Sequence, residues 1–189
     1  MKNSRKYFVA VAIAILAGVA LLLWYKTEST PTVPVRTSPA ALAELANYTR
    51  ISVQGDFELE VSQLQDYSID YLPLNARQGD LQARVENDTL IITGFGNRTA
   101  VDTAVLRIGV PVLDTLEVND VPRASVSNFT APLMNIRLAG VDAFTFQNNV
   151  LGSLNLEGRG GGVVNLRGNT LTTRNIQVED PGVINIIPD

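Results

Sequence analysis

Clustered carboxylates are the side chains best suited to chemistry in this 189-residue chain. Two carboxyl groups about 5–10 Å apart can hydrolyse a glycosidic bond, and several around a metal ion can support other carbohydrate chemistry. Arginines interleave these acids, and no long segment predicts a cleft around them. A carbohydrate-active lyase or glycosidase is therefore an alternative function and not the main prediction. The acids are Asp114, Glu117, Asp120, Asp142, Glu157, Glu179 and Asp180.

The composition excludes most other catalytic chemistry. The chain has no cysteine and no histidine. It therefore lacks disulfides, thiolate metal sites, a cysteine nucleophile and the commonest general base. A glycine cluster at 158–162 lacks the GxxxxGK[ST] pattern and the strand–loop–helix context of a phosphate loop, so it predicts a tight turn. We predict no catalytic residue, no cofactor and no metal ligand.

The N-terminal residues differ from the rest of the chain. Positive residues in the segment 1–6 precede an uncharged run at 7–25, which as a helix would span roughly 28 Å. Tyr7 at one end and Trp24 at the other suit the two membrane interfaces. The sequence therefore predicts an N-terminal transmembrane helix that acts as a signal anchor, with residues 1–6 in the cytoplasm. A cleaved signal peptide is the alternative, because Ala-Gly-Val-Ala at 17–20 resembles a cleavage site.

The charge distribution supports an exported domain. After residue 26, 11 arginines stand against all 19 acids, a net charge of −8. Such a surface repels nucleic acid, so no nucleic-acid partner is predicted. Residues 26–47 predict a proline-containing linker with a short helix near its end. The predicted location is the inner membrane, crossed once, with the C-terminal domain at 48–189 outside the cytoplasm.

From Tyr48 to Val110 the pattern has period two. Apolar residues alternate with polar ones in short runs, and Gly, Asn and Asp separate the runs. Several short strands at 8–12-residue spacing indicate an all-β domain.

The second half of the chain repeats every twenty residues without insertion or deletion. The repeated apolar positions predict two core columns. A third position repeats asparagine, which predicts a ladder of side-chain amides. The first core column is Leu116, Ile136, Leu156 and Ile176, the second is Val126, Phe146, Leu166 and Ile186, and the ladder is Asn135, Asn155 and Asn175.

A fixed period of twenty, with segments too short and too rich in Gly, Pro and Asp for helices, predicts a right-handed parallel β-helix. Two polar columns should then face outward, and we keep them as candidate surface sites beside the simpler interpretation that they only fix the register. The first is Glu117, Arg137 and Glu157, and the second is Ser125, Thr145, Asn165 and Asn185.

The order of motifs resembles the GIN domain family, the auto-transporter adhesin heads of bacterial envelope proteins. Ile51–Phe57 (ISVQGDF) opens the domain, and Val85–Ile92 (VENDTLII) resembles the family's "TLxI" element. Leu106–Leu116 (LRIGVPVLDTL) resembles its "VxVPxLxxL" entry into the repeats. The family's Gly-Ser-Gly corners are mostly replaced here, for example by Gly140-Val-Asp142. The resemblance covers roughly 48–189.

The resemblance implies an exported right-handed β-helix, sometimes assembled into trimers. We therefore predict a non-enzymatic binding, adhesion or scaffold module. Its partners would be the membrane through residues 7–25, an envelope protein or glycan, and further copies of the chain. A sensory role is a third interpretation, and it would need a partner because few residues lie in the cytoplasm. The apolar last strand at 184–187 predicts an end that side chains or another subunit cover.

Overall fold

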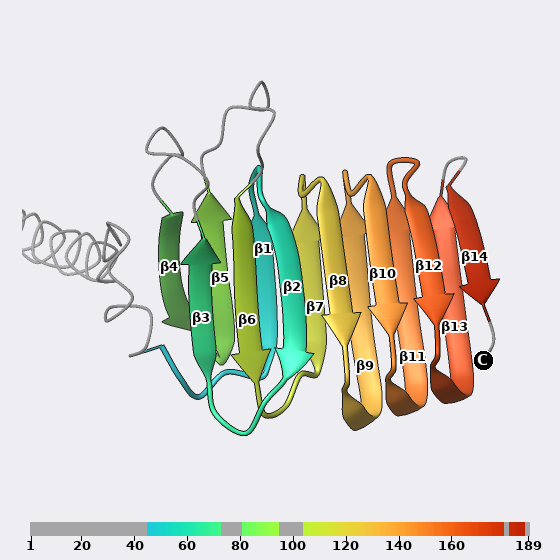
Figure 1. Cartoon of the computed structure of the whole chain (residues 1–189), viewed down its shortest axis with the longest axis horizontal. Coiled ribbons are helices and arrows are strands. Elements are labelled where there is room, and N and C mark those ends of the chain that lie inside the picture. The colour runs from blue at the N-terminus through green and yellow to red at the C-terminus, as the bar shows by residue number, and fades with distance from the viewer. Residues whose placement is uncertain (1–44, 73–80, 95–103, 180–181, 188–189) are drawn as a thin grey trace, which may run out of the picture. The chain divides into compact units, whose positions relative to one another are not determined.

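A computed structural model describes residues 45–72, 81–94, 104–179 and 182–187 of the chain. Every regular element in these ranges is a β-strand. The strands form two seven-stranded sheets that enclose one hydrophobic core (Figure 1). We call them sheet A and sheet B.

Sheet A is mixed but mostly parallel. Its strands follow each other in the order β13 (Thr170–Glu179), β11 (Val150–Arg159), β9 (Thr130–Ala139), β7 (Thr115–Asn119), β1 (Arg50–Gln54), β5 (Thr89–Gly94) and β4 (Leu81–Glu86). All neighbours are parallel except β4 and β5, which form an antiparallel pair at one edge.

Sheet B has the same design. Its order is β14 (Val183–Ile187), β12 (Val163–Arg167), β10 (Ala143–Gln147), β8 (Arg123–Ser127), β2 (Glu58–Gln63), β6 (Val105–Val110) and β3 (Ser68–Leu72). Only β3 runs antiparallel to its neighbour, β6. Each sheet therefore ends in an antiparallel strand on one side and a parallel strand on the other.

The first two strands of the domain lie in the middle of the sheets. β1 pairs with β5 on one side and β7 on the other, so Ile51 lies between Leu90 and Leu116. β2 lies in the same way between β6 and β8. Alternate residues of both strands are fully buried, as strands covered on one face require. Later strands thus extend the sheets in both directions from this centre.

From β7 onward the chain alternates between the sheets, and each strand pairs with the strand twenty residues later. Phe146 of β10 lies between Val126 of β8 and Leu166 of β12, and all three are buried. Ile136 of β9 likewise lies between Leu116 and Leu156. Side chains stacked at the parallel-strand spacing of about 4.8 Å build a continuous core. Its last members are less covered, because Ile186 is 47% exposed.

The tight turns between repeats use residues that tolerate left-handed backbone. Asp120 has φ 53°, Asn128 has φ 65° and Asn148 has φ 56°. Asparagine and aspartate adopt this region more readily than other residues with a β-carbon. Because the turns recur every twenty residues, residues that tolerate this conformation recur at the same spacing in the sequence.

Tyr48 closes the core beside the first strand. Its ring packs against Tyr67 with ring centres 4.8 Å apart, and Tyr67 donates a hydrogen bond to the Tyr48 carbonyl oxygen. The Tyr48 hydroxyl is buried without a hydrogen-bond partner in the described part of the chain. Burial, with a smaller electrostatic effect of Tyr67, raises the pKa of Tyr48.

The predicted fold class, a right-handed parallel β-helix preceded by a transmembrane helix, was wrong. The described residues form two mixed, largely parallel sheets and include no helix. The apolar alternation at 67–71 and 81–85 predicted strands, but alternation does not encode strand direction. It therefore could not reveal that β3 and β4 run antiparallel.

No helix in the described ranges is long and apolar enough to cross a membrane. The predicted anchor at 7–25 and the linker residues up to 44 lie outside those ranges. The domain boundaries at residues 6, 25 and 47 therefore stay predictions.

Candidate functional site

The outer face of sheet A carries the first predicted surface column. Glu117, Arg137 and Glu157 occupy register positions on β7, β9 and β11. Arg137 Nη1 lies 2.9 Å from Glu117 Oε1, and its Nε lies 3.5 Å from Glu157 Oε2. The hydrogen bond to Glu117, then the charges of both carboxylates, raise the pKa of Arg137. Because these ion pairs are solvent-exposed, they contribute little to stability and remain available to a ligand.

A shallow groove runs along this column. Its volume is about 350 Å³, within the size range of small-molecule sites. Arg159 extends the charged lining, and it also pairs with Glu179 of the last repeat at 3.3 Å. The groove therefore offers guanidinium donors and carboxylate acceptors in alternation. The lining residues are Glu117, Asn119, Arg137, Leu138, Ala139, Glu157 and Arg159.

The outer face of sheet B carries the second predicted column. Ser125, Thr145, Asn165 and Asn185 lie in register on β8, β10, β12 and β14. The Asn185 amide donates to Asn165 Oδ1 over 3.1 Å. This neutral ladder contrasts with the charged column of sheet A.

The predicted asparagine ladder lies partly in place. Asn155 donates to Asn135 Oδ1 over 2.9 Å, and Asn135 donates to the Asp114 carbonyl over 3.3 Å. Asn175 occupies the next register position and is exposed. Its bonding role in the ladder stays a prediction.

A second, more buried asparagine ladder was not predicted from the sequence. Asn149 is fully buried, and its Oδ1 accepts the Phe129 backbone N–H over 2.9 Å. Its amide donates to Val126 O and to Asn169 Oδ1, and Asn169 in turn donates to Phe146 O. These bonds satisfy buried backbone groups at the turns, so the ladder is structural. Its signal was visible as asparagine at the same turn position in two consecutive repeats.

The acidic residues do not converge on one point. Asp120 accepts a hydrogen bond from Gln54 over 3.1 Å, while Glu117, Glu157 and Glu179 pair with arginines. Within the described ranges, no three acidic side chains lie close enough together to hold a metal ion. Asp180 lies outside those ranges.

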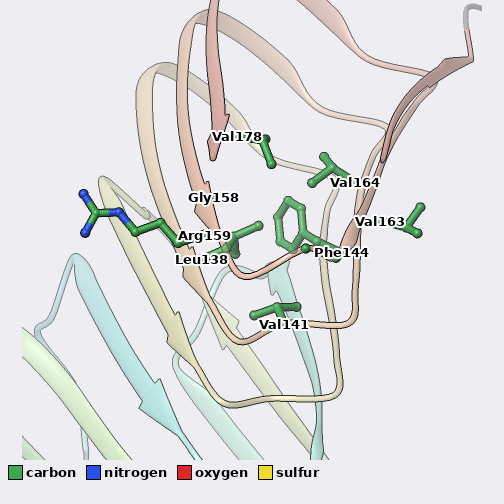
Figure 2. Close-up of a pocket in the computed structure, with 10 residues that line it drawn as sticks. Leu138, Val141, Phe144, Gly158, Arg159, Val163, Val164 and Val178 are labelled. Carbon is green, nitrogen blue, oxygen red and sulfur yellow. The ribbon is translucent and has the colours of Figure 1, made fainter. Parts of the chain in front are cut away.

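The glycine cluster forms a turn beside a small, partly open cavity. Gly160 has φ 98°, and a β-carbon on Gly162 would lie 1.9 Å from the Val141 carbonyl oxygen. Figure 2 shows Phe144 pointing into the cavity, whereas Arg159 points away from it. The cavity of about 10 Å³ has room for no more than about one water molecule. It is a packing defect and not a ligand site.

Three comparisons relate the chain to known proteins. A family model described as "Putative auto-transporter adhesin, head GIN domain" matches residues 47–187. No curated protein matches the chain.

Several solved structures are similar. One is a putative adhesin from Bacteroides fragilis NCTC 9343, 11% identical, which covers 77% of this chain and 94% of its own, with a TM-score of 0.37. A putative adhesin from Parabacteroides distasonis ATCC 8503 is 13% identical, covers 76% of this chain and 72% of its own, and has a TM-score of 0.40. A putative lipid binding protein from the same organism is 10% identical, with coverage of 76% and 94% and a TM-score of 0.36.

Proposed function

Because the matched model spans residues 47–187, this chain belongs to the head GIN domain family of auto-transporter adhesins, and we propose that it is a non-enzymatic binding module of the cell envelope. Its function is then to bind another molecule and not to convert a substrate. The anchor predicted at 7–25 would hold the domain at the membrane, with the sheets outside the cytoplasm. The partner is an envelope protein or a glycan.

The observation that carries this proposal is the charged groove of sheet A. Arg137 lies between two carboxylates, so the column presents both signs of charge along one face. A ligand with hydroxyl, carboxylate or ammonium groups could exchange these ion pairs at little cost, because water screens ion pairs on an exposed surface. Neighbouring strands repeat at about 4.8 Å, which suits an extended ligand better than a compact one.

Binding by the full chain tests the groove. The chain, held in lipid nanodiscs, is presented with solubilised envelope proteins in one arm and with purified cell-surface polysaccharide in the other. The Glu117→Gln/Arg137→Gln/Glu157→Gln variant removes the charges and keeps the side-chain shapes. We expect at least a tenfold weaker binding in the arm that contains the partner.

The matched control removes an ion pair of the other sheet. Arg123 Nη1 lies 3.0 Å from Glu58 Oε1 on the outer face of sheet B. The Glu58→Gln/Arg123→Gln variant should therefore bind as the unaltered chain does. Equal binding by the triple variant would overturn the groove as the site. New reducing ends in the polysaccharide arm would overturn the non-enzymatic proposal.

Membrane fractionation tests the proposed anchoring separately. The full chain should remain with membranes after a carbonate wash, and protease added outside the inner membrane should reach the domain. Substituting Leu16→Arg and Leu21→Arg places two charges in the apolar run, which should release the chain from the membrane or block its export. Unchanged fractionation of this variant would exclude 7–25 as the anchor.

A further inference from the structure

The last strand of sheet B differs from every other edge of the domain. Among the described residues β14 pairs with β12 alone, and it is the terminal strand of its sheet. Its apolar side chains are exposed on both faces, with Val183 at 53% and Ile187 at 43%. On the core-facing side, Ile184 and Ile186 are 39% and 47% exposed. An exposed, apolar edge strand of this kind is a template for further strand pairing.

The neighbouring edge of sheet A is protected against such pairing. Arg174 of β13 takes the register position that Met134 and Leu154 fill in the two preceding repeats. Met134 and Leu154 are fully buried, whereas Arg174 is exposed. A charged residue at a core position is a recognised means of blunting an edge. The contrast identifies β14 as the strand that remains open to a partner.

The sequence of β14 is nearly symmetric about its central residue. Val183, Ile184, Asn185, Ile186 and Ile187 read as branched apolar residues on either side of one asparagine. An antiparallel copy centred on Asn185 would place Val183 opposite Ile187, Ile184 opposite Ile186, and Asn185 opposite itself. A two-fold interface requires this kind of self-complementary patch.

We propose that two copies of the chain associate by antiparallel pairing of β14 about Asn185. The two B sheets then become one continuous sheet, and the apolar residues of β14 gain cross-strand partners on both faces. The facing Asn185 amides lie where they can hydrogen-bond, as Asn185 already does with Asn165 inside one chain.

A second copy is a better occupant of this edge than an unrelated strand, because the sequence of β14 is complementary to its own reversal about Asn185.

Cysteine cross-linking tests the pairing. The unaltered chain contains no cysteine, so no disulfide can form except at the introduced residue. Residues facing each other in an antiparallel pair have α-carbons about 4.5–5.5 Å apart, within reach of a disulfide. Mild oxidation of the full-length Asn185→Cys variant in membranes should convert most of it to a disulfide-linked dimer. Thr145→Cys is the matched control, because Thr145 lies in the same outward column two strands from the edge, about 10 Å away. Cross-linking no greater at 185 than at 145 would overturn the proposal.

A charge exchange tests the register. The Val183→Lys/Ile187→Lys variant places like charges opposite each other, whereas Val183→Lys/Ile187→Glu places opposite charges there. Both pairs of changes fall on exposed positions, so the fold should survive them. Sedimentation of the full chain in detergent should show at least a tenfold weaker dimer for the first variant and recovery for the second. Equal masses for the two variants, or open-ended assemblies larger than a dimer, would overturn the proposed two-fold pairing.

Discussion

The N-terminal part of the domain, residues 50–110, and the repeats, residues 115–187, build the same two sheets in different ways. In the N-terminal part, neighbouring strands are out of chain order, and an antiparallel strand closes each sheet. In the repeats, each strand pairs with the strand twenty residues later, and the sheets end on parallel strands. The core is therefore closed by antiparallel strands at the end formed by β3 and β4, and it ends on parallel strands at the end formed by β13 and β14.

Burial shows the consequence of this difference. Leu81 of β4 is 1% exposed although it lies on an edge strand, whereas Ile186 of β14 is 47% exposed. Both residues occupy core-facing positions of an edge strand. The alternation of apolar residues therefore selects the face of a strand that is buried, whereas the order of the strands decides whether further side chains cover that face.

The largest effect should come from a charge placed in the middle of the repeats. Phe146 is fully buried and stacks with Phe144 at 6.4 Å between ring centres. Phe146→Asp should cost at least about 4 kcal/mol and unfold the domain, because it removes a large apolar side chain and buries a carboxylate. The Ile186→Asp control, in the same column of the open repeat, should cost less than about 1 kcal/mol. Thermal unfolding followed by circular dichroism measures both, and similar losses would erase the distinction between the two ends.

The next effect should come from the buried ladder that only the repeats possess. Asn149→Ala leaves the Phe129 N–H without its acceptor inside the core. We expect a loss of about 2–3 kcal/mol in the free energy of unfolding, the cost of unsatisfied buried polar groups. Asn175→Ala changes an exposed asparagine of the last repeat and should cost under about 0.5 kcal/mol. Urea denaturation of the two variants would contradict this ranking if Asn175→Ala proved the more costly.

A gain of stability is expected in the N-terminal part. Tyr48→Phe removes a buried hydroxyl that has no partner in the described ranges, so the free energy of unfolding should rise by about 1 kcal/mol. The raised pKa of Tyr48 in the folded state also predicts that the original chain loses stability as pH rises above the ordinary tyrosine pKa of 10.0. The variant should lose less over that range. A denaturation series from pH 8 to 11 checks both statements, and parallel curves would refute the second.

The smallest gain should come from filling the cavity of Figure 2. Gly158 interrupts the column that Leu138 and Val178 continue on either side, and a β-carbon there would lie 3.4 Å from Val178 Cγ2. Gly158→Ala should stabilise the domain by about 0.5–1 kcal/mol, because it fills space and restricts the unfolded chain. Gly162→Ala is the control, since its β-carbon would clash with the Val141 carbonyl. A melting temperature lowered by Gly158→Ala would show that the cavity is not available space.

The sequence predicted the repeats far better than the N-terminal part. A period of twenty fixes which residues share a column, and the structure places Phe146 between Val126 and Leu166 as that period requires. Strand order in residues 50–110 follows from long-range pairing, such as Ile51 with Leu116, which no local pattern encodes.

Only part of the candidate site could be predicted from local sequence patterns. The column of Glu117, Arg137 and Glu157 could be written down from spacing alone, but the groove beside it depends on how neighbouring side chains pack. The Asn149–Asn169 ladder was overlooked because its asparagines lie in the turns, directly before β11 and β13, and not in a strand. Tyr48 gave no signal, since only burial distinguishes its hydroxyl from that of any other tyrosine.

The central position of β1 has a mechanical consequence for a domain that is pulled from its two ends. β1 is held by two parallel ladders, whereas β14 is held by one. Tension applied between the start and the end of the domain must break both ladders to extract β1, but only one to detach β14. The repeats should therefore detach one at a time from the C-terminal end under load, while β1 holds longest. A domain pulled in this way would lengthen in regular steps before β1 was extracted.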